Sequence, residues 1–174
     1  RCLCLRNGWF NYRWSQIFQA GSIPAKELVL KARPQRDGHE APFVPAPLAD
    51  VVATITAEKP DLVFATHVET SAGMILPDDY LREVARATHQ AGGLLVLDCV
   101  ASGALFVDMR ALGVDILITA PQKGWSASPG FGLILLSESA CAHLDQGNSH
   151  SFAMDLKKWQ QIMQTYETGG HAYH

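Results

Sequence analysis

In the stretch Val114-Asp-Ile-Leu-Ile-Thr-Ala-Pro-Gln-Lys123-Gly-Trp125, an apolar run leads directly to a lysine. The β-branched residues of this run predict a buried strand that stops at Pro121. Lysines mostly occupy solvated faces, so Lys123 is either an ordinary loop residue or an amine partly withdrawn from water. An amine of the second kind can condense with an aldehyde as a Schiff base.

A second predicted strand, Gly93-Leu-Leu-Val-Leu97, ends on Asp98. One strand end therefore presents a carboxylate, and the next predicted strand end presents a lysine. In an open parallel sheet, ligands bind outside the carboxyl ends of the strands. Pyridoxal phosphate needs this pair of groups, because a lysine holds its aldehyde carbon and an acid keeps its pyridine nitrogen protonated.

The order of predicted elements indicates an α/β fold, a mostly parallel sheet with helices on both faces. Strands are expected at residues 1–5, 28–30, 61–66, 93–97, 114–118 and 130–136. Helices are expected at residues 11–20, 48–59, 77–90, 109–112, 137–145 and from Asp155 onward, with a surface loop at residues 32–47. Three polar loops then gather at one edge of the sheet, at residues 67–73, 98–103 and 120–125.

The composition is that of a globular protein, with 48% hydrophobic and 18% charged residues among 174. A net charge of −3 gives no reason to expect a nucleic-acid or membrane-surface partner. No apolar run reaches the roughly 18 residues that a membrane helix needs. Four cysteines without CxxC spacing favour free thiols in a reducing compartment, so a cytoplasmic protein is expected.

The motifs, taken in order, resemble those of the class V aminotransferases, which are fold type I pyridoxal-phosphate enzymes. The similarity is greatest to the alanine–glyoxylate and serine–glyoxylate aminotransferases. The matching segments are Asn7-Gly-Trp-Phe10 with Arg13, His67-Val-Glu-Thr-Ser-Ala-Gly73, Leu97-Asp-Cys-Val-Ala-Ser102, Gln122-Lys-Gly124 and His171-Ala-Tyr-His174. Each motif alone is weak, whereas the ordered set, which covers nearly the whole chain, is specific.

The resemblance implies a role for each matching residue. Lys123 would form the Schiff base and move the substrate proton, and Asp98 would pair with the pyridine nitrogen. Five further residues would bind the cofactor: Val100 under the ring, Phe10 stacked on its other face, Thr70 at the phenolic oxygen, Gln122 near the phosphate, and Tyr173 at the phosphate of a neighbouring subunit. The implied protein is a homodimer that transfers an amino group from alanine or serine to a 2-oxo acid such as glyoxylate or pyruvate.

The same comparison implies that the chain is one partial large domain, residues 1–174. The family's phosphate-binding glycine loop would precede Arg1, and its small domain, with the substrate-carboxylate arginine, would follow His174. Two alternatives stay open: another class V enzyme, such as a lyase or a desulfurase, and a non-catalytic scaffold.

Three other motifs carry little functional weight. Gly124-Trp-Ser126-Ala-Ser128 departs from a serine-hydrolase nucleophile elbow at its fifth position, and Pro129 follows where a helix should begin. His67 is expected to be a loop histidine bonded to backbone. His171 and His174 lack a nearby acidic third ligand, so no metal site is expected.

Overall fold

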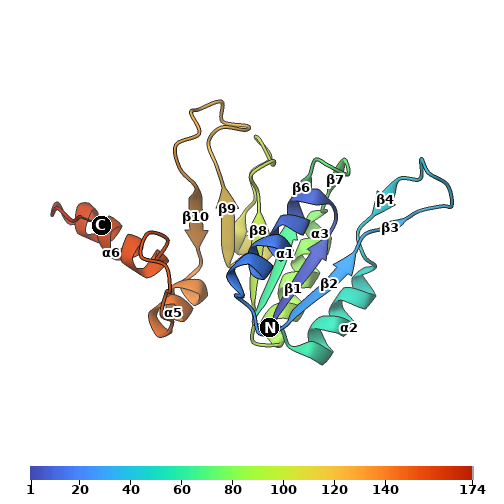
Figure 1. The fold of residues 1–174 in the computed structure, drawn as a ribbon, viewed down its shortest axis with the longest axis horizontal. Coiled ribbons are helices and arrows are strands. Elements are labelled where there is room, and N and C mark those ends of the chain that lie inside the picture. The colour runs from blue at the N-terminus through green and yellow to red at the C-terminus, as the bar shows by residue number, and fades with distance from the viewer. Residues whose placement is uncertain (174) are drawn as a thin grey trace. The chain divides into compact units, whose positions relative to one another are not determined.

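A computed structural model describes residues 1–173, which form two compact units, Arg1–Ser137 and a unit that starts at Glu138 (Figure 1). The first unit contains β1 (Cys2–Arg6), α1 (Trp9–Gly21), β2 (Glu27–Lys31), β3 (Arg33–Pro34), β4 (Phe43–Val44), α2 (Leu48–Glu58), β5 (Leu62–Thr66), β6 (Val68–Glu69), β7 (Met74–Ile75), α3 (Asp78–Gln90), β8 (Leu94–Asp98), α4 (Met109–Leu112), β9 (Ile116–Thr119) and β10 (Leu133–Leu136). The second unit contains α5 (Glu138–Gln146) and α6 (Leu156–Glu167).

Six strands form the main sheet, in the order β10-β9-β8-β5-β1-β2. Every neighbouring pair is parallel except β10 with β9. The predicted mostly parallel α/β sheet is therefore confirmed. Because the strands run in parallel, β5, β8 and β9 end at the same edge, where Figure 1 also shows the β6–β7 hairpin.

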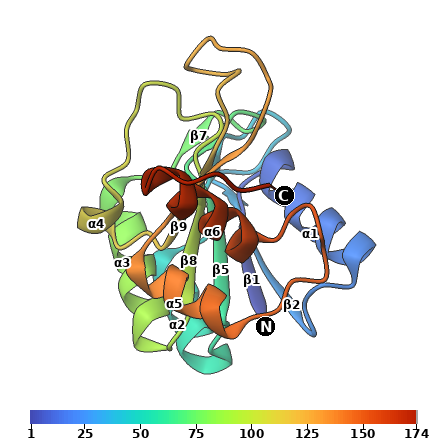
Figure 2. The same ribbon diagram turned by 90° about the vertical axis from the view of Figure 1, so that its left-hand side faces the viewer.

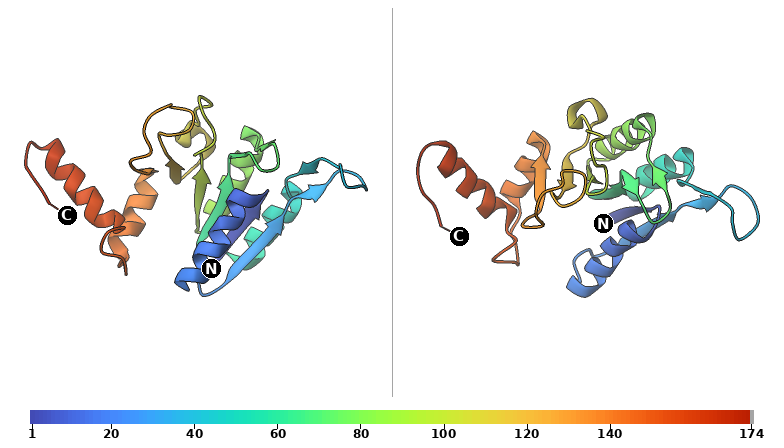
Figure 3. Two further views of the ribbon diagram at one scale, coloured as in Figure 1. Left: turned by 45° about the horizontal axis from the view of Figure 1, so that its top comes forward. Right: turned by 90° about the horizontal axis from the view of Figure 1, so that it is seen from above.

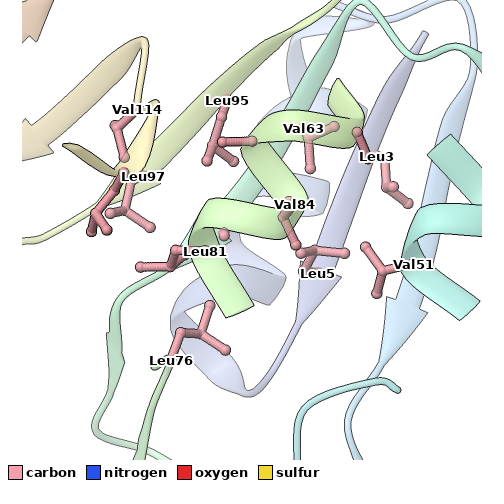
Figure 4. Packing of buried hydrophobic residues seen from close by; sticks show 14 of the residues in the cluster. Leu3, Leu5, Val51, Val63, Leu76, Leu81, Val84, Leu95, Leu97 and Val114 are labelled. Atoms are coloured by element: carbon pink, nitrogen blue, oxygen red, sulfur yellow. The ribbon is translucent and has the colours of Figure 1, made fainter. Parts of the chain in front are cut away.

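Helices cover both faces of this sheet, as the element order predicted. On one face, Leu3, Val63 and Leu95 belong to an apolar cluster with residues of α2 and α3 (Figure 4). The residues that alternate with them point to the opposite face, where Phe64 packs with Phe18 of α1. Figures 2 and 3 show α1 on the side of the sheet opposite to α2 and α3. Each fully buried aliphatic or aromatic side chain contributes about 1.5–3 kcal/mol, so this two-sided core holds the strand ends in place.

The helix α3 illustrates how closely pattern and structure agree. Its buried residues include Leu81, Val84, Ala85 and Thr88, which repeat at the predicted helical spacing. The helix is followed by Gly92-Gly93, as expected, and the second glycine is required by space. A Cβ atom at Gly93 would lie 2.3 Å from the carbonyl oxygen of Pro60.

Two details differ from the sequence predictions. The expected loop at residues 32–47 contains a short antiparallel hairpin of β3 and β4. In α6, Asp155 caps the helix as predicted, accepting hydrogen bonds from the amides of Lys157 and Lys158. The apolar spacing in α6 predicts an inner face made of Leu156, Trp159, Ile162, Met163 and Tyr166. Only Ile162 is buried, and the other four are half-buried or exposed. A unit of two helices offers too little surface to bury a complete apolar stripe.

Candidate active site

The aligned strand ends surround a pocket of about 240 Å³. Five of the seven predicted cofactor residues line it, namely Phe10, Asp98, Val100, Gln122 and Lys123. They come from three separate segments, the start of α1, the end of β8 and the loop after β9. The structure thus brings the carboxylate and the lysine of successive strand ends to one pocket.

Asp98 occupies the last position of β8 and pairs in register with Thr66 of β5 and Ile118 of β9. Residues paired in this way point to the same face of a sheet, so Asp98 faces the side covered by α1. Its Oδ1 atom accepts a hydrogen bond of 2.9 Å from the amide of Val100. Burial raises the pKa of the Asp98 carboxyl, and the Glu69 carboxylate adds to this, whereas the Val100 amide and Arg13 oppose it.

Lys123 lies in the loop after β9, and its solvent exposure fits the first of the two interpretations of the sequence, an ordinary loop position. The residue is exposed rather than partly withdrawn from water, because the loop from Gln122 to Gly132 is exposed throughout. Its Nζ atom nevertheless lies 5.8 Å from the centroid of the Phe10 ring.

The loop that carries Lys123 touches the loop that follows Asp98. A Cβ atom at Gly124 would lie 2.1 Å from Cα of Gly103 and 2.7 Å from its carbonyl carbon. The two backbones can approach so closely only because Gly124 has no side chain. This contact explains how two segments 25 residues apart in the sequence, at Asp98 and Lys123, reach the same pocket.

Phe10 lies in the first turn of α1, and Arg13 follows three residues later on the same side of the helix. The Arg13 guanidinium carbon lies 5.2 Å from the centroid of the Phe10 ring. The ring therefore has two cationic groups within reach, Arg13 and Lys123, at distances typical of cation–π contacts. Phe10 itself is half-buried, which leaves part of the ring available at the pocket.

Six pocket residues were not predicted to have a site role: Arg13, Trp14, Ile17, Thr66, Val68 and Ala101. The helical spacing of Trp14, Ile17 and Phe18 predicts one buried face of α1, which is only partly correct because Ile17 is exposed at the pocket. The residues of α1 that are buried are Asn11, Ser15 and Phe18. Arg13 appeared only as part of the Asn7–Phe10 motif, and its position one turn after Phe10 is the signal that could have identified it.

Thr66 has an unusual position beside Asp98. Its side chain is buried, and its Oγ1 atom has no hydrogen-bond partner within residues 1–173. An unsatisfied buried hydroxyl costs about 1–3 kcal/mol, and this one lines the pocket. A polar ligand group in the pocket would satisfy it.

The other two predicted cofactor residues are not among those that line the pocket. Thr70 is exposed in the turn of the β6–β7 hairpin. Tyr173 is 91% exposed in the unit that starts at Glu138. Their proposed contacts with a cofactor stay predictions.

Of the residues in the remaining motifs, His67, His171 and Ser126 lie in the described part of the chain. His67 is buried, and its Nδ1 atom lies 2.8 Å from Oγ of Ser102, a side-chain partner rather than the expected backbone one. His171 is described, whereas His174 lies outside the described residues. Ser126 has φ 52°, but the chain continues to β10 without an intervening helix, so no nucleophile elbow forms.

Residues 1–173 contain no group of three or more His, Cys, Asp or Glu side chains placed to hold a metal ion. Among the helices of the same residues, none combines the length and the apolar character that crossing a membrane requires.

A sequence profile described as Aminotransferase class-V matches residues 40–172. The chain belongs to the class-V aminotransferase family. A curated relative, the 2-aminoethylphosphonate–pyruvate transaminase of Vibrio cholerae, is 30% identical over 92% of this chain and 41% of its own length. The corresponding protein of Paraburkholderia phymatum is 32% identical over 90% of this chain and 39% of its own length. The chain thus spans about two fifths of the length of these class-V relatives.

Solved structures show the same fold. An alanine–glyoxylate aminotransferase from Nostoc sp. matches with a TM-score of 0.78 and 24% identity, over 99% of this chain and 42% of that one. The apo cysteine desulfurase of Thermococcus onnurineus matches with a TM-score of 0.58 and 18% identity, over 79% and 31%. These likenesses confirm the predicted large-domain fold of the fold type I enzymes.

Proposed function

We propose that the protein is a pyridoxal-phosphate-dependent aminotransferase. It moves an amino group from a small amino acid, alanine or serine, to a 2-oxo acid such as glyoxylate or pyruvate. One observation carries the proposal: Asp98 and Lys123, from successive strand ends, line a single pocket with the Phe10 ring. Relatives named for pyruvate as amino acceptor support the reaction class.

The residues present fit the proposed cofactor. Asp98 is a half-buried carboxylate whose pKa is raised by burial, so a cation beside it would restore its ordinary ionisation. The unpartnered Oγ1 atom of Thr66 offers a hydrogen bond next to it. The Phe10 ring provides a flat apolar surface, worth roughly 0.5–1.5 kcal/mol beyond area burial when another ring stacks on it.

When bound, pyridoxal phosphate supplies an aldehyde and an electron-accepting ring. Asp98 would hold the proton of the ring nitrogen, and Phe10 and Val100 would orient the ring from its two faces. The Lys123 amine would bind the aldehyde carbon and, when displaced by an amino donor, take the proton from the donor's α-carbon. Gln122, Thr70 and Tyr173 are proposed to bind the cofactor's polar groups.

We also propose a domain organisation, a cellular compartment and an oligomeric state. The chain is part of a large, cofactor-binding domain, and the working protein is a cytoplasmic homodimer in which Tyr173 serves the partner's site. A desulfurase is the nearest alternative, and Cys99 is not its expected catalytic cysteine, because burial raises the pKa of this thiol to about 11 and so suppresses its thiolate. Neither a lyase nor a non-catalytic scaffold is favoured by a specific observation.

The experiment is a set of substitutions in the purified full-length protein, assayed with pyridoxal phosphate, amino donors and glyoxylate or pyruvate. Lys123→Ala is expected to abolish transamination, and Asp98→Asn to retain cofactor but lose most turnover. Lys31→Ala, at an exposed lysine of β2, is the matched control and is expected to behave like the unsubstituted protein. Full activity in Lys123→Ala would refute the proposed function.

A further inference from the structure

The helix α1 begins without a capping side chain of its own. Its N-cap residue is Gly8, and no side-chain hydrogen bond is made from that position. The first amides of a helix lack intrahelical partners and must be satisfied from elsewhere. In α1 these are the amides of Trp9, Phe10 and Asn11.

The β6–β7 hairpin supplies the missing acceptors. The Glu69 carboxylate accepts hydrogen bonds from the amides of Phe10, at 3.3 Å, and Asn11, at 3.1 Å. Oγ of Ser71 accepts from the amide of Trp9 at 2.8 Å and donates to Glu69 at 2.5 Å. Two side chains that lie about 60 residues further along the chain therefore cap the whole first turn of α1.

The surroundings of Glu69 are consistent with a role as the N-terminal cap of α1. Its relative exposure is 0%, and no salt bridge to it is found within residues 1–173. A buried carboxylate is costly unless it is paired or hydrogen-bonded. At a helix N-terminus it meets both the amide donors and the positive end of the helix dipole, which compensate its charge.

The close packing around Gly8 also indicates that Glu69 and Ser71 belong to the start of α1. A Cβ atom at this position would lie 2.4 Å from Oγ of Ser71 and 2.7 Å from Cγ of Glu69. With φ 176° its backbone is extended, so the glycine is explained by close approach and not by conformation. The hairpin and the helix terminus are packed against each other too closely for a side chain to intervene.

This cap acts directly on the residue whose ring lines the pocket, because Glu69 accepts from the backbone amide of Phe10. Phe10 and Arg13 of α1 line the pocket. Thr66, the last residue of β5, and Val68, which precedes Glu69 in β6, line it as well. Any movement of the first turn of α1 would move the Phe10 ring relative to Asp98 and Lys123.

We propose that Glu69 is a positioning residue. With Ser71 it caps α1 from the neighbouring hairpin and so fixes the Phe10 ring over the pocket. The role rests on the proposed function, because the ring that Phe10 would stack on is that of pyridoxal phosphate.

The cap itself is tested by amide hydrogen exchange without added cofactor. Glu69→Gln replaces one acceptor oxygen with an amide donor, so one backbone amide faces another donor. Exchange at Phe10 and Asn11 is expected to become about 2- to 30-fold faster, the range of a lost helix cap. Unchanged exchange would overturn the inference. If Glu69→Gln does not fold, Ser71→Ala removes the acceptor of the Trp9 amide and one donor to Glu69 but leaves the Glu69 carboxylate in place. The Trp9 amide is then the one expected to exchange faster.

The positioning role is tested by pyridoxal-phosphate affinity, followed through quenching of tryptophan fluorescence, since Trp14 lines the pocket. Glu69→Gln is expected to weaken binding by about 2- to 12-fold, the equivalent of one lost ring stack. In a Phe10→Leu background the same substitution is expected to have no further effect, because it acts through that ring. Additive effects of the two substitutions would overturn the positioning role.

A matched control separates positioning from general stability. Asp108 caps α4 by accepting from the amide of Ala111 and does not line the pocket. Asp108→Ala is expected to lower stability and leave the affinity unchanged; an equal loss of affinity would count against Glu69 as a specific positioner. If the unsubstituted protein binds no pyridoxal phosphate, the proposed function fails and the positioning role with it. Normal binding together with unchanged exchange in Glu69→Gln refutes only the present inference.

Discussion

The Nζ atom of Lys123 lies 5.8 Å from the centroid of the Phe10 ring, although the two residues are 113 positions apart in the sequence. The contact joins the loop after β9 to the first turn of α1. It places the one group that would hold the cofactor covalently beside the ring that would stack on it.

Removing the Phe10 ring is expected to weaken cofactor binding while leaving the fold intact. Phe10→Leu keeps an apolar side chain but loses the stacking surface, which corresponds to an affinity about 2- to 12-fold weaker. Phe10→Trp, which restores a larger ring, is expected to bind as well as the unsubstituted protein. Equilibrium binding of pyridoxal phosphate measures both. Phe43→Leu, at an exposed position of β4, is the control, and an equal loss there would contradict the stacking role.

A side chain at Gly124 is expected to separate the two loops that form the pocket. In Gly124→Ala the new Cβ atom would overlap the backbone of Gly103, and such overpacking costs about 1–3 kcal/mol. Urea unfolding and cofactor binding should both show the loss. Gly130→Ala, in the same loop, is the matched control, because no atom lies within 4 Å of a Cβ placed there. Similar results for the two variants would show that the loop contact does not matter.

The Asp98 carboxyl is expected to make the cofactor-free protein less stable as the pH rises. Burial raises its folded pKa above the ordinary value of 3.8, so the folded state binds protons more strongly than the unfolded state. Stability therefore falls as the pH rises from about 4 through the raised pKa. Asp98→Asn, whose Oδ1 atom can still accept from Val100, should melt at a higher temperature than the unsubstituted protein at pH 7. The difference should shrink below about pH 4. A gain that is the same at both pH values would contradict this explanation.

Asp115 is expected to be important for stability and not for the pocket chemistry. Its buried carboxylate accepts from the amide of Leu95 at 2.8 Å, contacts Nε2 of His89 at 2.7 Å and accepts from Oγ of Ser137 at 3.1 Å. Asp115→Ala leaves the buried Leu95 amide without its acceptor, at a cost of about 1–3 kcal/mol. Chemical denaturation should show this loss. Asp79→Ala, in a surface ion pair with Arg82, should cost at most about 1 kcal/mol.

The parts of the site that could be predicted from the sequence are those where a local pattern determines position. An apolar run that ends in Asp98, and another followed by Lys123, place both residues at one edge of a parallel sheet. The solvent exposure of Lys123 could not be predicted in this way. It depends on the path of an exposed loop, which no periodicity determines.

The residues that the sequence did not identify act through contacts between distant segments. Thr66 reads as an ordinary strand residue, and only its register with Asp98 reveals an unsatisfied hydroxyl at the pocket. Ser15 is polar, yet it is buried on α1, where its hydroxyl donates to Glu27 and accepts from Arg6. Asn11 is buried there too, because its Nδ2 atom donates to the Phe64 carbonyl and its backbone amide donates to Glu69. Glu69 reads as a loop acid, and its role becomes apparent only where the β6–β7 hairpin meets the start of α1.

The most direct test of the proposed chemistry is to find which lysine binds the cofactor. The purified protein is incubated with pyridoxal phosphate, reduced with borohydride and digested, and the modified peptide is sequenced by mass spectrometry. We predict a single phosphopyridoxyl group on Lys123, reduced in yield when an amino donor is added before the borohydride. Labelling of another lysine, or equal labelling of several exposed lysines with none preferred, would contradict the assignment of this pocket as the active site.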